Sequence, residues 1–168
     1  MYRLLRCIVV LTVAGLMVVA ATVPAAAAQS TTRPFSGSLV GGAAQVPDAG
    51  CPFGVRTEVW GIGQVTHLGR TSMTASHCTQ FLGAPETGVQ TFVAANGDRL
   101  EMSYVLTSDP YVPVEGAVLT LHGQTVVTGG TGRFAQASGE FIVNSRAILH
   151  FTAPIELWLS WHGQEISY

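Results

Sequence analysis

Lysine is absent from the 168-residue sequence, and eight arginines are its only basic side chains apart from histidine. Charged residues make up 11% of the chain, well below the share of about a quarter that is usual in globular proteins. Nucleic acid is therefore not an expected partner, because phosphate binding needs a basic footprint. Since no basic amphipathic helix is present either, we expect no attachment to an anionic membrane surface.

Only one long apolar run exists, and it lies at the N-terminus. Arg3 and Arg6 precede this run, which ends at Pro24 before the small-residue segment AAAAQS. This order is typical of a secretory signal peptide, so we predict that residues 1–28 are removed on secretion and that residues 29–168 form a single domain. A retained membrane anchor is the less favoured alternative, because no basic stop-transfer flank follows. Residues 29–168 keep six arginines and ten acidic residues, a formal charge of −4.

Cysteine is scarce as well. Cys7 belongs to the predicted signal peptide, which leaves Cys51 and Cys78 in the exported chain. An even pair in an exported protein predicts a disulfide bond. A metal pair or a catalytic thiol is the alternative, but the chain has no C-x-x-C motif to favour it.

Signatures of metal and cofactor sites are missing. The histidines show no H-x-H or H-x-x-x-H spacing, so ordinary hydrogen-bonded strand residues are the favoured interpretation of His67, His77, His122, His150 and His162. There is also no G-x-S-x-G nucleophile elbow and no G-x-x-x-x-G-K-[ST] phosphate loop. We therefore expect no metal and no cofactor.

Period-two alternation is the main pattern that is present. In residues 99–107 every second residue is apolar or aromatic, which predicts a strand with one buried face made of Leu100, Met102, Tyr104 and Leu106. Asn96-Gly97 just before it predicts a hairpin with a type I′ turn. Similar patterns predict that Leu119, Leu121, Thr125 and Val127 share a face, as do Ile155, Leu157, Leu159 and Trp161.

The number and spacing of these segments indicate an all-β fold. Eight strands fit into residues 29–168, and nothing between them reads as a long helix, which leaves a sandwich or a closed barrel. Glycine favours the barrel, because Gly61, Gly63, Gly123 and Gly163 lie inside strand patterns, where tightly curved sheets use glycine. We predict an eight-stranded antiparallel β-barrel.

Two motifs carry a resemblance to a known group. The stretches GIGQVTHLGRTSMTAS and GGTGRFAQASGEF, with a weaker match at the terminal GQEISY, resemble bacterial secreted proteins with an allene oxide cyclase barrel-like fold, which are related in shape to plant dirigent proteins. The resemblance spans most of residues 56–168. It implies an eight-stranded antiparallel barrel with a small central cavity.

The same resemblance implies little about activity. Allene oxide cyclases close a fatty-acid epoxide with a glutamate on an early strand, whereas the first strand here offers Ser36 and Ser38 and no acid. The acidic and basic cavity residues of dirigent proteins have no clear counterparts either. The resemblance therefore supports the fold and not cyclase activity.

The glycine-rich stretch of residues 126–140, VTGGTGRFAQASGEF, allows two interpretations. Glycine amides and Arg133 could cradle a phosphate. The favoured interpretation is a strand, a glycine bend at 129–132, a short helical turn and the next strand, because lone glycine motifs are weak signals.

One group of residues is a candidate site. Arg56, Glu58 and Trp60 alternate and so share one strand face. If that face points inward, Glu58 could act as an acid or base with Tyr104 as its partner, while Arg56 and Trp60 contact a ligand. An exposed salt bridge beside a surface aromatic is the favoured interpretation, since period two does not say which face is inside.

Two functional classes remain open at this point. The first is a non-catalytic secreted barrel that binds a small apolar ligand or a partner protein. The second is an isomerase or lyase of cyclase-like type that acts on a hydrophobic substrate in the barrel cavity. An inward cluster of an acid, a tyrosine and a cavity would favour the enzyme, and a cavity lined by aliphatic residues alone would favour binding.

Overall fold

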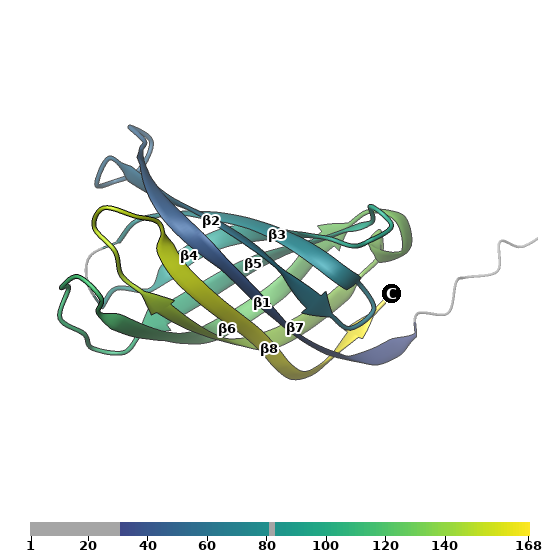
Figure 1. The fold of residues 1–168 in the computed structure, drawn as a ribbon. Coiled ribbons are helices and arrows are strands. Elements are labelled where there is room, and N and C mark those ends of the chain that lie inside the picture. The colour runs from purple at the N-terminus through teal and green to yellow at the C-terminus, as the bar shows by residue number, and fades with distance from the viewer. Residues whose placement is uncertain (1–30, 81–82) are drawn as a thin grey trace, which may run out of the picture.

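The described part of the chain is a closed β-barrel. The computed structural model describes residues 31–80 and 83–168, without the side chains of residues 163 and 164; the predicted signal peptide, residues 1–28, lies outside the described residues. Each strand pairs antiparallel with the next, and the last pairs with the first, which closes the sheet (Figure 1). The strands are β1 (Thr32–Pro47), β2 (Val55–Val65), β3 (Gly69–Cys78), β4 (Glu86–Val93), β5 (Arg99–Ser108), β6 (Val118–Gly130), β7 (Ser138–Ile148) and β8 (Ile155–Ser167).

The two ends of the barrel differ. At one end, here called the terminal end, the start of β1 pairs with the end of β8, and β2–β3, β4–β5 and β6–β7 are joined (Figure 1). At the other end, here called the cavity end, the connections leave β1, β3, β5 and β7. Figure 1 shows the terminal end on the right and the cavity end on the left.

Alternation along the strands places apolar residues inside the barrel. In β5, Leu100, Met102 and Tyr104 are buried while Arg99 and Glu101 are exposed. The same inward placement holds for the predicted faces of β6 and β8. This alternation arises because every second residue of a strand faces the closed interior. The predicted all-β class and the eight-stranded antiparallel barrel are confirmed.

The predicted hairpin exists, but its predicted turn type is wrong. Val93 pairs with Arg99, so the connection spans residues 94–98 rather than two residues. The backbone N–H of Gly97 donates to the carbonyl of Ala94, and Gly97 has a φ of 88° while Asn96 has a negative φ. A type I′ turn needs positive φ at both central residues, whereas four- and five-residue hairpin loops are most often built around a type I turn.

Glycine inside the strands allows neighbouring backbones to approach. A Cβ atom at Gly63 would overlap the carbonyl oxygen of Ser38 on β1, and one at Gly123 would overlap that of Val105 on β5. Both residues were expected from the sequence to mark sites of tight curvature, and these approaches provide the physical reason.

Aromatic side chains form part of the barrel core. Phe35 and Phe141 stack with their ring centroids 4.0 Å apart, and Phe92 meets Trp161 edge to face at 4.9 Å. All four side chains are buried. Because none of the four lines the cavity described below, the fold combines an aromatic-packed core with an open space elsewhere in the barrel.

The glycine-rich stretch forms a bend between strands. β6 ends at Gly130, a 3₁₀-helix (η1, Gly132–Phe134) follows, and β7 begins at Ser138. Phe134 of this helix is fully buried in the core. The favoured interpretation of this stretch as strand, bend, helical turn and strand is confirmed.

Candidate functional site

A cavity occupies the interior of the barrel at the cavity end. Its volume is about 160 Å³. Residues from all eight strands line it, and most of the wall is aliphatic, including Val59, Leu106, Leu121, Val143, Leu157 and Leu159. A wall of this kind favours apolar molecules, and the polar side chains that also line it determine which of them can bind.

One group of polar side chains lies around the inward face of β4. Glu86, Gly88 and Gln90 alternate there. His77 on β3 and Tyr104 on β5 are the two register partners of Gly88. Gly88 has no side chain, and a Cβ atom at this position would overlap the hydroxyl of Tyr104. This glycine therefore leaves the space in which His77 and Tyr104 meet across the intervening strand.

His77 contacts both Tyr104 and Glu86. Its Nδ1 atom lies 2.7 Å from the Tyr104 hydroxyl oxygen, in a hydrogen bond between two buried side chains. Its Nε2 atom lies 3.3 Å from Glu86 Oε2. Glu86 is the most exposed of the three residues, with 31% of its side chain accessible to solvent against 6% for His77. The three residues, here called the polar chain, thus run from the interior towards solvent.

Burial determines the charge states of the polar chain. It lowers the pKa of His77 to about 4, so this imidazole is neutral at pH 7. Burial also raises the pKa of the Glu86 carboxyl above its ordinary value. The pKa of the Tyr104 hydroxyl is raised by burial and then by the nearby Glu86 carboxylate. Tyr104 is therefore suited to hydrogen bonding and not to acting as a phenolate base.

These charge states determine which groups of the polar chain donate and which accept hydrogen bonds. A neutral imidazole carries one N–H group, and an ionised carboxylate can only accept a hydrogen bond. The Glu86 carboxylate therefore favours the tautomer with hydrogen on Nε2 of His77. Nδ1 then accepts, and the hydroxyl of Tyr104 donates to it. The remaining hydrogen-bonding capacity of the Tyr104 oxygen is to accept.

Among the other polar side chains in the cavity wall are two hydroxyl groups without a partner in the described part of the chain. Thr125 on β6 and Ser145 on β7 are buried, and their hydroxyl oxygens have no hydrogen-bond partner among the described residues. Most buried polar groups in proteins are hydrogen-bonded. These hydroxyls are therefore available to a polar group of a bound molecule.

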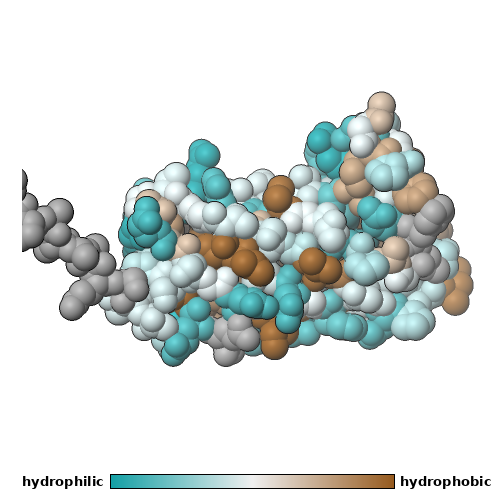
Figure 2. Space-filling model, turned by 180° about the vertical axis from the view of Figure 1, so that it is seen from behind, coloured by the Kyte–Doolittle hydropathy of each residue, from teal (hydrophilic) through white to brown (hydrophobic). Residues whose placement is uncertain are grey.

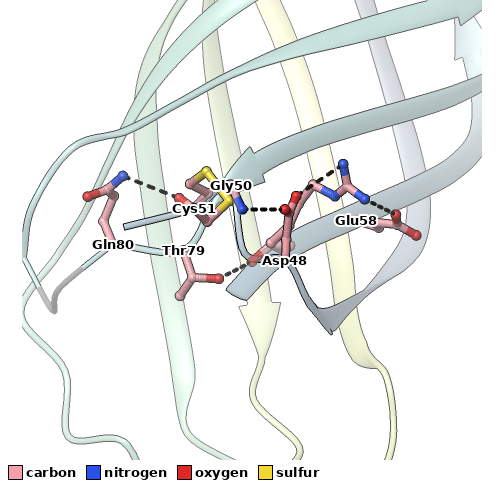
Figure 3. The surroundings of a disulfide bond; sticks show 9 residues. Asp48, Gly50, Cys51, Glu58, Thr79 and Gln80 are labelled. Atoms are coloured by element: carbon pink, nitrogen blue, oxygen red, sulfur yellow. Dashed lines mark hydrogen bonds and ion pairs between the residues drawn. A yellow bond between two sulfur atoms is a disulfide. The ribbon is translucent and has the colours of Figure 1, made fainter. Parts of the chain in front are cut away.

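The predicted disulfide closes one side of the cavity end. Cys51, in the connection between β1 and β2, is bonded to Cys78 at the end of β3, which confirms the prediction. Beside it, the hydroxyl oxygens of Thr57 and Thr79 lie 2.9 Å apart, and Asp48 accepts a hydrogen bond from the N–H of Gly50 (Figure 3). Because Cys78 directly follows His77, the bridge also fixes the strand end that carries the imidazole.

The structure places Arg56, Glu58 and Trp60 apart from Tyr104. The Arg56 guanidinium lies 3.3 Å from Asp48 and 3.5 Å from Glu58, and the Glu58 side chain is 51% exposed. These residues line a hollow on the outer surface of β2, β3 and β4. This is the exposed arrangement that the sequence favoured; of the four residues proposed together, only Tyr104 faces the cavity.

A second histidine cluster connects two loops at the cavity end. His150 Nδ1 lies 2.7 Å from Glu115 Oε1, and Nε2 lies 3.4 Å from Glu156 Oε1. The hydrogen bond with Glu115 is the main cause that raises the pKa of His150, and the same bond lowers the pKa of Glu115. The cluster therefore holds the connection after β5 against the connection after β7.

Residues 31–80 and 83–168 contain neither a metal-binding cluster nor a membrane-spanning helix. In these ranges no group of three or more His, Cys, Asp and Glu side chains is arranged to hold a metal ion. No helix in the same ranges has the length and apolar character needed to cross a membrane.

Sequence reasoning missed His77, Glu86, Gly88 and Gln90 as site residues. His77 was interpreted as an ordinary strand residue, and no strand was predicted to begin at Glu86. The signal was nevertheless present, because alternation continued backward from Phe92 places Gln90, Gly88 and Glu86 on one face. Counting the hairpin register through residues 94–98 then places Gly88 opposite Tyr104.

Comparison with known proteins finds no match, since no protein-family model, no curated protein and no solved structure matches this chain. The description of the site therefore rests on the geometry of this chain alone.

Proposed function

We propose that this protein binds a small, largely apolar molecule in the cavity at the cavity end of the barrel. The observation that carries the proposal is the combination of a largely aliphatic wall with the polar chain Tyr104–His77–Glu86, in which the hydrogen bond between Tyr104 and His77 is buried. Binding sites for small molecules typically combine an apolar lining with a few placed polar groups. A volume of about 160 Å³ suits a molecule with a single ring.

The side of the outer surface seen in Figure 2 favours a small molecule over a partner protein, whereas exposed Val40, Ile62 and Trp158 lie side by side as register partners on β1, β2 and β8. On the side seen in Figure 2, hydrophobic residues form several separate groups among hydrophilic and intermediate ones. Protein-binding surfaces are usually marked by a larger contiguous apolar patch.

The proposal also includes export and family membership. We place the protein outside the cell, with residues 1–28 removed as a signal peptide, and the disulfide supports this placement because such bonds persist in oxidising compartments. Membership of the allene oxide cyclase barrel-like group is supported by the motifs in residues 56–168 and by the eight-stranded barrel.

Native mass spectrometry of the protein recovered from the medium of cells that express the full chain tests both parts. We expect the mass of a chain whose first residue lies near residue 29, together with the additional mass of a bound small molecule. Ala147→Leu, which fills the cavity from β7, should remove the bound molecule. Val105→Leu on the outer surface is the matched control and should retain it. Clean protein without any bound mass in all three forms would contradict ligand binding.

An isomerase or lyase is the second candidate function. It is favoured by the inward cluster of an acid, an imidazole and a tyrosine inside a cavity, since proton transfer needs groups within hydrogen-bond reach. The raised pKa of Glu86 moves this carboxyl towards the range of a useful base. Incubating the recovered molecule with the protein in D₂O distinguishes the two functions, because deuterium uptake or chemical conversion indicates an enzyme and an unchanged molecule indicates binding alone.

A further inference from the structure

The charge of the cavity argues against anionic ligands. Among the described residues that line it, Glu86 is the only Asp, Glu, Lys or Arg. His77 is neutral at pH 7 and offers no compensating positive charge. A carboxylate or phosphate that entered the cavity would lose its hydration without gaining a cation as partner, which is costly in an apolar environment.

The direction of the polar chain argues for a ligand that donates a hydrogen bond. Nδ1 of His77 lies 2.7 Å from the Tyr104 oxygen. With the tautomer that Glu86 favours, Tyr104 donates its hydroxyl hydrogen to Nδ1, so the Tyr104 oxygen is left to accept from a ligand. A donor on the ligand would extend the chain from ligand to Tyr104, to His77 and to the Glu86 carboxylate. The hydrogen bond between Tyr104 and His77 would be linked to that of the ligand, and the Glu86 carboxylate 3.3 Å from His77 Nε2 adds an electrostatic contribution. A ketone or an aldehyde cannot make this contact, because it can only accept.

We propose that the ligand is a neutral alcohol with a single-ring apolar body, whose hydroxyl group donates to the Tyr104 oxygen. This inference rests on the proposed function and names the ligand class for the same cavity. A neutral hydroxyl is preferred over an ammonium group because the accepting atom is the uncharged Tyr104 oxygen, while Oε2 of Glu86 lies against His77.

Five probes of one shape test the proposal with the full exported protein. They are cyclohexanol, methylcyclohexane, cyclohexanone, cyclohexylamine and cyclohexanecarboxylate, and their dissociation constants are measured by ligand-observed NMR. We expect cyclohexanol to bind about tenfold more tightly than methylcyclohexane, which corresponds to one net hydrogen bond. The carboxylate should not bind. In a cavity without a hydrogen-bond partner the order would be reversed, because the alcohol would lose its hydration without compensation.

Variants assign the preference to the polar chain. Tyr104→Phe should abolish the preference for cyclohexanol and leave the binding of methylcyclohexane unchanged. Glu86→Gln should weaken the preference while the barrel stays folded, since Glu86 lies at the solvent end of the polar chain. Glu58→Gln is the matched control on the outer surface and should leave all five constants unchanged.

The possible outcomes separate this inference from the proposed function. Equal or tighter binding of methylcyclohexane, cyclohexanone or cyclohexylamine would overturn the alcohol class and leave small-molecule binding standing. If none of the probes binds but native mass spectrometry finds a bound molecule, the inference again fails alone. If none binds and no bound mass is found, both fail together.

Discussion

Gly88 and Tyr104 are register partners on β4 and β5, and a Cβ atom at Gly88 would overlap the Tyr104 hydroxyl. The same Cβ atom would also overlap the backbone carbonyl oxygen of Ser76 on β3. Gly88→Ala should therefore displace the phenol ring, break its hydrogen bond to His77 and destabilise the protein by about 1–3 kcal/mol, as overpacking does. Urea unfolding measures the stability, and the ¹⁵N shift of His77 Nδ1 reports the hydrogen bond.

A second strand glycine provides the control for Gly88. At Gly61 the nearest atoms to an added Cβ are 3.4 Å away or more, which is ordinary van der Waals contact. Gly61→Ala should change stability by less than about 1 kcal/mol and leave the His77 signal in place. Equal effects of the two substitutions would show that Gly88 does not make room for Tyr104.

The buried imidazole of His77 predicts a loss of stability in acid. An unfolded chain protonates this histidine below about pH 6.5, whereas burial lowers its pKa in the folded protein to about 4. The stability that neutral His77 contributes is thus complete above pH 6.5 and is lost as the pH falls towards 4. Between pH 7 and 4.5 the expected loss is about 2–3 kcal/mol. The raised pKa of Glu86 acts in the opposite direction and offsets part of it.

Unfolding curves at several pH values test this dependence. His77→Gln should show a smaller loss of stability than the natural protein between pH 7 and 4.5. His150→Gln is the control of opposite sign, because the raised pKa of His150 means that its contribution is present in acid and is lost as the pH rises through that pKa. If His77→Gln and the natural protein have the same pH dependence, His77 is not a buried neutral imidazole.

The sequence could predict which residues share a strand face, but not always which face lies inside. In β5 and β8 the large apolar residues mark the interior, and the predicted faces are correct. In β2 the inward positions include Thr57 and Gly61, while Trp60 and Ile62 lie outside with 42% and 59% exposure. A strand with its largest side chains outside gives no reliable signal of orientation, so Glu58 could not be placed from the sequence.

The polar chain was harder to predict because it forms only when three successive strands, β3, β4 and β5, pair in the correct register. His77 and Tyr104 are separated by 27 positions and lie on strands that are not neighbours. They meet only because β4 lies between them with a glycine at the shared register position. The disulfide was predictable, by contrast, because only two cysteines remain once the predicted signal peptide is set aside.

Removal of the Thr125 hydroxyl is expected to increase the free energy of unfolding. Thr125 is fully buried, and its oxygen has no hydrogen-bond partner among the described residues. Thr125→Val keeps the shape of the side chain and removes the unpaired polar group, so we expect a stabilisation of about 1 kcal/mol. Thermal and urea unfolding of the ligand-free protein measure it.

Thr71 provides the matched control for Thr125. It is also buried, but its hydroxyl donates to the carbonyl of Gly69 at 2.9 Å. Thr71→Val should therefore destabilise the protein by about 1 kcal/mol. Destabilisation by both substitutions would mean that the Thr125 hydroxyl has a partner in solution and is not available to a ligand.

The disulfide is expected to contribute strongly to the free energy of unfolding. It links residues 27 positions apart, and the chain-entropy relation gives about 3–4 kcal/mol for a loop of this length. The double variant Cys51→Ser, Cys78→Ser should lose that amount in urea unfolding. An intact mass that shows two free thiols in the exported natural protein would contradict the bond.

Two features of Gly132, its backbone conformation and its closeness to one side chain, favour glycine at this position of the glycine-rich stretch. Its φ is +58°, a region that favours glycine, and an added Cβ would overlap the carboxylate of Asp98 in the connection between β4 and β5. Gly132→Ala should destabilise the protein by about 2–4 kcal/mol in urea unfolding, from the backbone conformation and the overlap together.

Gly69 provides the control, because it has a similar φ of +69° with open space around it. Gly69→Ala should therefore show the cost of the backbone conformation alone, about 1–2 kcal/mol. If both variants lose the same stability, the contact with Asp98 contributes nothing. If Gly132→Ala keeps its stability and loses ligand binding, the stretch is a binding loop instead of a bend.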